Sequence, residues 1–328
     1  MNKNRTIYIK IAGGLSHSES FIKIIKNNFF LSKRVLNKIN FKFETYDGIN
    51  SKFTSGRIKR NINLDKKIIN LIKYYNKNNI TFSFVAGNHI INLKDTSDQG
   101  WELINILNEF NDLFFDNSLH RNGIIIGNEL FRRYLRNNSN LKIVRSITSH
   151  PNLPKNFSFN TKLDKKIIDY YKKLEEKYDI IVPRFEMVFH PDFLKFMNLE
   201  KYQVIPDDVC IYNCPLFREH MYKINMYNYF KSASDHIYDL REHKTEMTKC
   251  EECWVFDPDN DWYKETLKYH SNGVCKNGMC IYEENELKVL FKYYNKIKLT
   301  GREKNDNVYF EDLKNYLLKL NDFFEKEI

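Results

Sequence analysis

Short runs of β-forming residues alternate with segments of helical apolar spacing along most of the chain. The strand-like runs are largely apolar, which is typical of strands buried on both faces of a parallel sheet. Residues 123–127, with the sequence GIIIG, are the clearest case. The expected strands are residues 6–11, 41–46, 80–86, 123–127, 141–147, 180–183, 202–205 and 297–299. The expected helices are residues 18–25, 64–75, 101–114, 129–136, 163–178, 191–197, 216–229, 283–294 and 312–324.

This alternation predicts an α/β protein built from parallel strand–helix–strand units. The number of strand candidates favours a TIM-like (β/α)8 barrel over a doubly wound sheet. Gly13-Gly14 follows the first strand but lacks the rest of the dinucleotide-binding pattern, which also disfavours the doubly wound sheet. We therefore expect a single TIM-like barrel domain that spans residues 1–328.

Two segments depart from the regular alternation. Residues 231–280 are irregular, polar and cysteine-bearing, as an insertion near the C-terminal end of the barrel would be, and residues 304–328 end in a terminal helix. No apolar run approaches the ~18 residues of a membrane span. Lys10 interrupts the short apolar run near the N-terminus, and no small-residue cleavage site follows it. We expect no membrane partner and a cytoplasmic location.

The formal net charge of +10 has two interpretations. Clustered lysine and arginine side chains bind the phosphates of nucleic acids, so RNA is one candidate partner. The second interpretation is a solvated surface, because the lysines are dispersed along the predicted helices beside glutamate and aspartate. The high content of Lys, Asn and Ile is also typical of an AT-rich genome. The charge therefore leaves both an anionic partner and a solvated surface open.

All six cysteines lie in the last two-fifths of the chain, in three close pairs. In a reducing compartment, clustered cysteines are expected to be metal ligands or reactive thiols rather than disulfides. Thiolate pairs in loops suit both zinc and iron–sulfur clusters, and the last four cysteines could close a zinc site by themselves. The alternative is that several are small buried apolar side chains. The candidate metal ligands are Cys210, Cys214, Cys250, Cys253, Cys275 and Cys280.

Polar residues follow most of the expected strands, where the active sites of barrel enzymes lie. Each also has a structural interpretation, as a turn residue or a helix cap. Outside residues 207–220, which are considered next, these residues are Asp47, Asn88, His89, Asn128, Glu129, Thr148, Ser149, His150, Arg184, Glu186, Gly301, Arg302 and Glu303.

Residues 207–220 combine the first cysteine pair with Arg218 and His220, directly after the strand at 202–205. Arg218 is a candidate for binding an anionic substrate, and His220 is a candidate for proton transfer. Both could equally be surface residues that open the next helix. Phe217 occupies the third position of the Cys-x3-Cys-x2-Cys motif, which excludes an enzyme that cleaves S-adenosylmethionine.

Two motifs resemble the collagenase-like peptidase family. The first is the pair of cysteines after a strand, with Cys214-Pro215, Arg218 and His220. The second is the sequence IKLTGRE at residues 297–303, which is similar to the Lys-hydrophobic-x-Gly-Arg motif at the end of the family's last barrel strand. The resemblance covers residues 202–303, and it implies a TIM-like barrel in which Lys298, Gly301 and Arg302 match that motif.

The resemblance also implies a cofactor and a type of chemistry. Relatives in the family carry a 4Fe–4S cluster on four cysteines and support oxygen-independent hydroxylation of RNA bases or quinone precursors. Here it implies that Cys210 and Cys214, with later cysteines, take the place of those four ligands. Which four of the six bind is left open, and we expect one of Cys250 or Cys253 and one of Cys275 or Cys280 to complete the set. The family's Pro-Ala-Gly phrase is absent, the cysteine spacing differs, and there are six cysteines instead of four. A divergent member with a different substrate is therefore expected.

Three functions compete at this point. The first is an iron–sulfur barrel enzyme that acts on RNA or a small metabolite, with Arg218 and Arg302 binding an anionic group and His220 or Glu186 transferring protons. Its electron donor is unknown. The second is a zinc-stabilised protein that binds nucleic acid without catalysis. The third, a peptidase, ranks last because no nucleophile–base pair or His-Glu-x-x-His helix is visible.

Overall fold

The computed structural model describes residues 5–48, 62–86, 98–116, 119–151, 162–206, 284–299 and 305–328. The expected helix at 216–229 and the expected insertion at 231–280 lie outside these residues. In the described part of the chain, no helix is long and apolar enough to cross a membrane.

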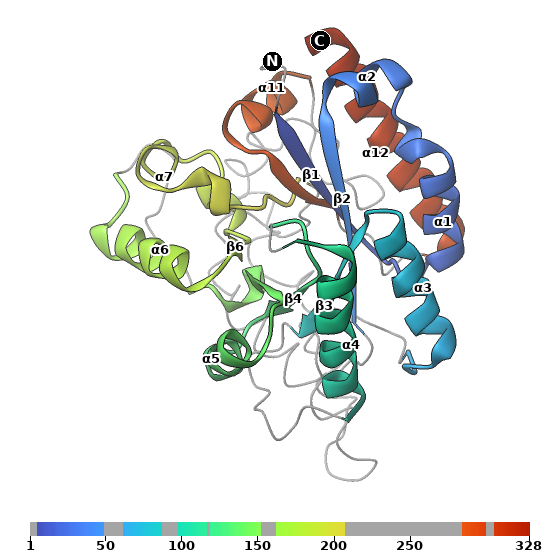
Figure 1. Ribbon diagram of the computed structural model, residues 1–328. Coiled ribbons are helices and arrows are strands. Elements are labelled where there is room, and N and C mark those ends of the chain that lie inside the picture. The colour runs from blue at the N-terminus through green and yellow to red at the C-terminus, as the bar shows by residue number, and fades with distance from the viewer. Residues whose placement is uncertain are drawn as a thin grey trace, which may run out of the picture.

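Seven parallel strands form one curled sheet with the order β6-β5-β4-β3-β2-β1-β7. Helices cover the outer side of this sheet (Figure 1). Strands that neighbour each other in the sequence also neighbour each other in the sheet for β1 to β6, so the strand order does not reverse at a switch point as it does in a doubly wound sheet. The strands are β1 Thr6–Ala12, β2 Asn40–Asp47, β3 Thr81–Ala86, β4 Gly123–Ile126, β5 Lys142–Arg145, β6 Ile180–Ile181 and β7 Lys296–Leu299.

The helices agree with the expected ones to within a few residues at most positions. Two differ. α12 begins six residues before the expected start at residue 312, because the Asn305 side chain accepts a hydrogen bond from the Val308 amide and caps the helix. α2 was not expected. The described helices are α1 Ser18–Lys26, α2 Lys33–Lys38, α3 Lys66–Lys77, α4 Asp98–Phe114, α5 Glu129–Asn138, α6 Lys165–Lys177, α7 Pro191–Phe196, α11 Glu284–Tyr293 and α12 Asp306–Glu327.

Residues 202–204 connect the two edge strands of the sheet. Tyr202 forms a parallel bridge with Ile181 of β6, and Val204 forms one with Ile297 of β7. The Gln203 amide donates to the Ile181 carbonyl at 2.9 Å, and the Val204 amide donates to the Lys296 carbonyl at 3.0 Å. The edges of the curled sheet are therefore hydrogen-bonded to one segment that lies between them.

The side chains of the strands divide between two cores. One large core fills the space between the sheet and the helices and includes Ile9 and Ile11 of β1. Since successive side chains of a strand point to opposite faces, Lys10 faces the inner side of the curled sheet. A smaller apolar cluster occupies that inner side and contains Ala12, Tyr46, Val85, Ile125, Val144, Ile180, Val182 and Ile205.

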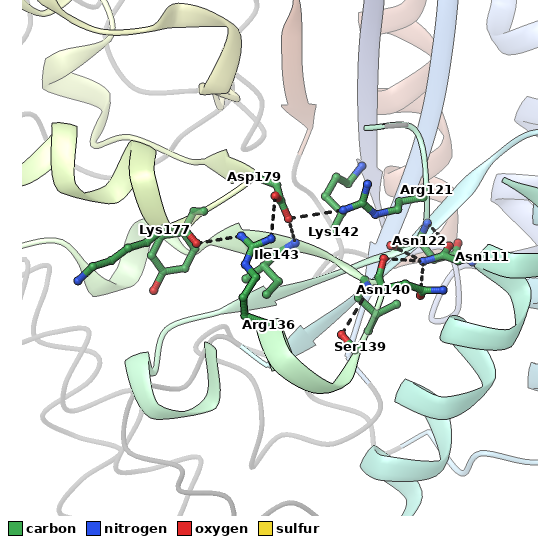
Figure 2. A network of polar contacts seen from close by, with 12 residues as sticks. Asn111, Arg121, Asn122, Arg136, Ser139, Asn140, Lys142, Ile143, Lys177 and Asp179 are labelled. Carbon is green, nitrogen blue, oxygen red and sulfur yellow. Dashed lines mark hydrogen bonds and ion pairs between the residues drawn. The ribbon is translucent and has the colours of Figure 1, made fainter. Parts of the chain in front are cut away.

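Asparagine and aspartate side chains tie together the segments that precede the strands (Figure 2). The side-chain oxygen of Asn111 on α4 accepts from the Asn122 amide at 2.7 Å, and the Asn122 side chain accepts from the Phe82 amide at 2.8 Å. Asp179 accepts from the Ile143 amide at 2.8 Å. These bonds satisfy backbone groups at the amino-terminal edge of the sheet, an edge whose conserved polar contacts in barrel proteins serve stability.

Gly123 leaves the space that its neighbours on β3 and β5 need. An added Cβ would lie 2.6 Å from the Lys142 carbonyl oxygen and 3.3 Å from the Ser83 hydroxyl. We expect Gly123→Ala to lower the free energy of unfolding by about 2 kcal/mol or more, since overpacking forces the backbone to shift. Urea unfolding measures this. The comparison variant Ser83→Ala adds no atom and removes only the hydrogen bond from the Lys10 ammonium, which should cost about 1.5–3 kcal/mol. An alanine variant at 123 as stable as the parent would contradict the packing.

Candidate functional site

A charged row crosses the inner side of the sheet. Lys298, Lys10 and Glu44 are direct partners in the strand register, on β7, β1 and β2 respectively. Strand alternation places all three on the inner side. Interiors of parallel barrels are dominated by branched apolar side chains, so this row departs from the usual filling.

Glu44 is shared by two lysines. Its Oε2 lies 3.0 Å from the Lys10 Nζ, and its Oε1 accepts a hydrogen bond from the Lys142 Nζ. The Lys10 ammonium also donates to the Ser83 hydroxyl at 3.2 Å. Lys10 is 0%, Glu44 2% and Lys142 1% exposed. One carboxylate therefore compensates two buried ammonium groups.

Lys142 lies on β5, and its side chain reaches Glu44 on β2 across the two strands between them, β4 and β3. Ser83, Gly123 and Lys142 are consecutive partners in the register of β3, β4 and β5. Their side chains are small at the first two positions, so the lysine stem can extend over them. Gly123 and Ser83 are thus required by the ion pair as well as by the packing.

The shared contact shifts both ionisation equilibria. Burial raises the pKa of Glu44, but the ammonium groups of Lys10 and Lys142 outweigh burial and lower this pKa to about 2. Burial lowers the pKa of Lys142 to about 8, because its attraction to Glu44 does not offset the loss of water. The charged form is favoured for Glu44 but not for Lys142, because Glu44 contacts two cations whereas Lys142 shares its one anion with the other lysine.

Lys296 occupies the layer nearest the amino-terminal edge of the sheet. Its ammonium donates to the Glu200 carbonyl at 2.6 Å and lies 5.0 Å from the centre of the Tyr8 ring. With Lys296 and Lys298 included, the described inner face carries four buried lysines, while Glu44 is its one buried carboxylate. The described interior is therefore electropositive.

The layer nearest the carboxyl ends of the strands is mainly apolar. The side chain of Tyr46 extends across this layer, above the small side chain of Ala12, its register partner on β1. Its hydroxyl donates a hydrogen bond to the Leu299 carbonyl at 3.1 Å. The Lys298 Nζ lies 4.4 Å from the centre of the Tyr46 ring, within the range of a cation–π contact. This places one cation beside one aromatic ring at the carboxyl-terminal end of the interior.

Asp47, at the end of β2, holds the loop that follows β1. Its Oδ2 accepts from the Ser16 amide and hydroxyl, both at 2.8 Å, and from the Leu15 amide at 3.2 Å. Its Oδ1 accepts from the Gly48 amide at 2.9 Å. These bonds support the structural interpretation of Asp47 as a loop-holding residue.

Glu186 lies in a buried ion pair with Arg184 beyond β6. The Arg184 Nη2 lies 2.6 Å from the Glu186 Oε1, and the Arg184 Nε lies 3.1 Å from its Oε2. Arg184 also donates to the Pro151 carbonyl at 3.1 Å. A two-point contact of this kind fixes the orientation of the carboxylate.

His150 and Asn128 have structural partners. The His150 Nε2 donates to the Val182 carbonyl at 2.7 Å, and its Nδ1 lies 3.0 Å from the Tyr170 hydroxyl. Burial, together with the charge of Arg145, lowers the pKa of His150 to about 3, so its imidazole is neutral at pH 7. Asn128 caps α5, as the capping interpretation predicts.

Most of the residues predicted for the site lie outside the described residues. These are Cys210, Cys214, Arg218, His220, Cys250, Cys253, Cys275, Cys280 and Arg302. Among the described residues, no group of three or more histidine, cysteine, aspartate or glutamate side chains could hold a metal ion. Sequence reasoning missed the Lys10–Glu44–Lys142 cluster. The available signal was a lysine between two apolar residues at Lys10 and at Lys142, while Glu44 lies between Phe43 and Thr45 in a strand of alternating character.

Comparisons with known proteins assign no family. No family model matches the chain, and no curated protein matches it. Among solved structures, the chain is similar to the U32 peptidase Mk0906, at 9% sequence identity and a TM-score of 0.45, over 92% of this chain and 95% of that one. At this identity and TM-score, the likeness assigns neither a family nor an activity, and the fold rests on the strand pairing itself.

Replacing Glu44 tests the central ion cluster. Glu44→Gln should lower the free energy of unfolding by about 3–5 kcal/mol, because it leaves two buried ammonium groups without a carboxylate. The surface pair of Glu311 and Lys314, at 3.1 Å, supplies the control, and Glu311→Gln should cost less than about 1 kcal/mol. The triple variant Lys10→Met, Glu44→Leu, Lys142→Met should recover most of the loss. Equal costs for the two glutamine variants would rule out the buried cluster.

The same cluster predicts how stability depends on pH. The folded pKa of Glu44 is depressed from 4.5 to about 2, so its contribution is present above pH 4.5 and is lost as pH falls toward 2. The folded pKa of Lys142 is depressed from 10.5 to about 8, so the unfolded chain binds more protons between these values and the Lys142 contribution rises with pH there. Unfolding of the parent, Glu44→Gln and Lys142→Met across pH measures both. A parent-to-variant difference that stays constant with pH would contradict these shifts.

Proposed function

We propose that this chain is a (β/α)8-barrel enzyme of the collagenase-like peptidase type, in which residues 202–204 take the eighth strand position. The support is the pair of bridges that join this segment to β6 and β7, the two edges of the sheet. The parallel direction of both bridges agrees with the direction of a barrel strand.

The functional part of the proposal is supported by the place where the cysteine-bearing sequence begins. The described chain leaves the sheet at Pro206, directly after the bridged segment, and is next described at Glu284. All six cysteines lie in the intervening sequence. Because residues 202–204 run parallel to the other strands, Pro206 lies at their carboxyl ends, where barrel enzymes carry their active sites. The cysteine-bearing segment therefore begins at the active-site end of the barrel.

The proposed cofactor is a 4Fe–4S cluster held by four of the six cysteines. The ligands are Cys210, Cys214, one of Cys250 or Cys253, and one of Cys275 or Cys280. Among the described residues, no group of histidine, cysteine, aspartate or glutamate side chains could hold a metal ion, and all six cysteines lie between residues 207 and 283. When bound, such a cluster supplies electron transfer.

The chain's own residues bind the substrate and move protons. Arg218 and Arg302 bind an anionic group of the substrate, which is an RNA or a small metabolite of the cytoplasm. His220 or Glu186 transfers protons. For Glu186, the supporting observation is its position just beyond β6, with both oxygens oriented by Arg184. The reaction class is oxygen-independent hydroxylation.

Anaerobic purification tests the cofactor. The protein should be brown and contain about four iron and four sulfide per chain. Cys210→Ser and Cys214→Ser should each lower the iron content strongly, because each removes a thiolate ligand. Lys314→Met, on the exposed side of α12, is a control that should leave the iron content unchanged. Colourless protein with stoichiometric zinc, bound to RNA in a salt-dependent way, would instead establish the zinc-stabilised binding protein.

A further inference from the structure

We propose that the outer faces of α3 and α4 form a dimer interface, in which a second copy of this chain places its α3 on α4 and its α4 on α3. Two exposed rows of opposite charge, with the same spacing, point to this arrangement. Neither the proposed cofactor nor the proposed reaction enters into it.

α3 carries a row of lysines on its exposed side. Lys66, Asn70, Lys73 and Lys77 follow one another at intervals of four, three and four residues, so they form one stripe along the helix. All four are exposed, and the helix contains no aspartate or glutamate. Among the described residues, neither Lys66 nor Lys73 has an ion-pair partner. The outward face of α3 is therefore basic.

α4 carries the opposite charge in a matching row. Glu102, Asn105, Glu109 and Asp112 form one exposed stripe, in a helix that contains no lysine or arginine. The two glutamates are seven residues apart, as are the first two lysines of α3, and an asparagine lies between the charges in both rows. Neither glutamate has an ion-pair partner among the described residues. The two rows are therefore complementary in charge and in spacing.

The two helices lie side by side on the outer side of the sheet (Figure 1). They precede the neighbouring parallel strands β3 and β4, so they run in the same direction. If a two-fold axis runs parallel to the helices and lies between them, α3 of one copy faces α4 of the other. Each row then meets a row of opposite charge, in which charges seven residues apart are about 10 Å apart along the helix.

Apolar side chains accompany both rows. Tyr74 on α3 is 36% exposed, and Leu113 on α4 is 68% exposed, the largest value among the exposed large apolar side chains of the described residues. Each lies four residues beyond a member of its row, Asn70 or Glu109, and so belongs to the same face. A second copy would remove both side chains from water. Their burial adds the stabilisation that surface ion pairs alone do not supply.

The distribution of charge favours a second copy over RNA. The phosphates of an RNA strand would be attracted to α3 but repelled by the acidic row on α4 beside it. A second copy is attracted by both rows, because it presents each of them to the other. In α6 and α12, by contrast, lysines and carboxylates are mixed within one helix, which is typical of a solvated surface.

Reversing the charges tests the interface. Sedimentation velocity at about 0.1 M salt measures dimerisation while distant charges are screened. The parent should form a concentration-dependent dimer. Lys66→Glu with Lys73→Glu should weaken dimerisation by about tenfold or more, because two acidic rows then face each other. Glu102→Lys with Glu109→Lys should do the same with two basic rows. An equimolar mixture of the two double variants should form a heterodimer, because each reversed row meets the opposite sign.

Lys165→Glu with Lys172→Glu is the matched control, since it reverses two exposed lysines seven residues apart on α6. It should dimerise as the parent does. Heterodimerisation of the mixture also shows that both double variants are folded. The inference is overturned if the parent stays monomeric, if the mixture does not associate, or if the α6 control weakens the dimer as much. A monomeric parent that binds single-stranded RNA through Lys66 and Lys73 would instead establish α3 as a nucleic-acid surface.

Discussion

The structure depends on one buried carboxylate that two lysines share. Glu44 on β2 binds Lys10 of the adjacent strand and Lys142 of β5, three strands away. A buried charge is unfavourable unless it is paired, so the three strands have to meet in one register for the chain to fold. Because a slip of one residue would turn these groups toward the helices, the cluster specifies the register that also directs the isoleucines outward.

The sequence around the cluster is adapted to it. Ser83 on β3 and Gly123 on β4 occupy the register positions between Lys142 and β2, and neither has a side chain large enough to block the lysine. At the amino-terminal edge, the Asn122 and Asp179 side chains accept from the amides of Phe82 and Ile143, the second residues of β3 and β5. Toward the carboxyl ends the interior becomes mainly apolar, and the Lys298 ammonium lies 4.4 Å from the centre of the Tyr46 ring there.

Much of the fold could be predicted from the sequence, because each strand and helix leaves a local pattern. The apolar run at 123–127 and the alternation at 41–46 both correspond to strands, and the parallel sheet follows from their alternation with helices. Local boundaries were harder. β6 ends at Ile181, before Pro183, which lacks an amide proton for strand pairing. α2 was missed because a helix of 6 residues is too short to show a helical apolar period, and the capping residue Ser32 was the available signal of its start.

The interior charges could not be predicted in the same way. A lysine in a strand indicates a solvated face when read alone, and only the order and register of β1 to β5 in the sheet show that Lys10, Glu44 and Lys142 meet. Glu186 was chosen from its position after a strand, and its ion pair with Arg184 depends on how the chain turns there. The cysteine site was predicted from sequence and stays a prediction, because its residues lie outside the described part of the chain.

The central claim is that a cysteine-held cluster lies at the carboxyl ends of the strands. An anomalous difference map, recorded at the iron edge from crystals grown anaerobically, tests this claim most directly. The account predicts iron density beyond the carboxyl ends of residues 202–204 and β7, on the side of Tyr46 and Lys298. Iron density at the amino-terminal edge, beside Asn122 and Asp179, would contradict it.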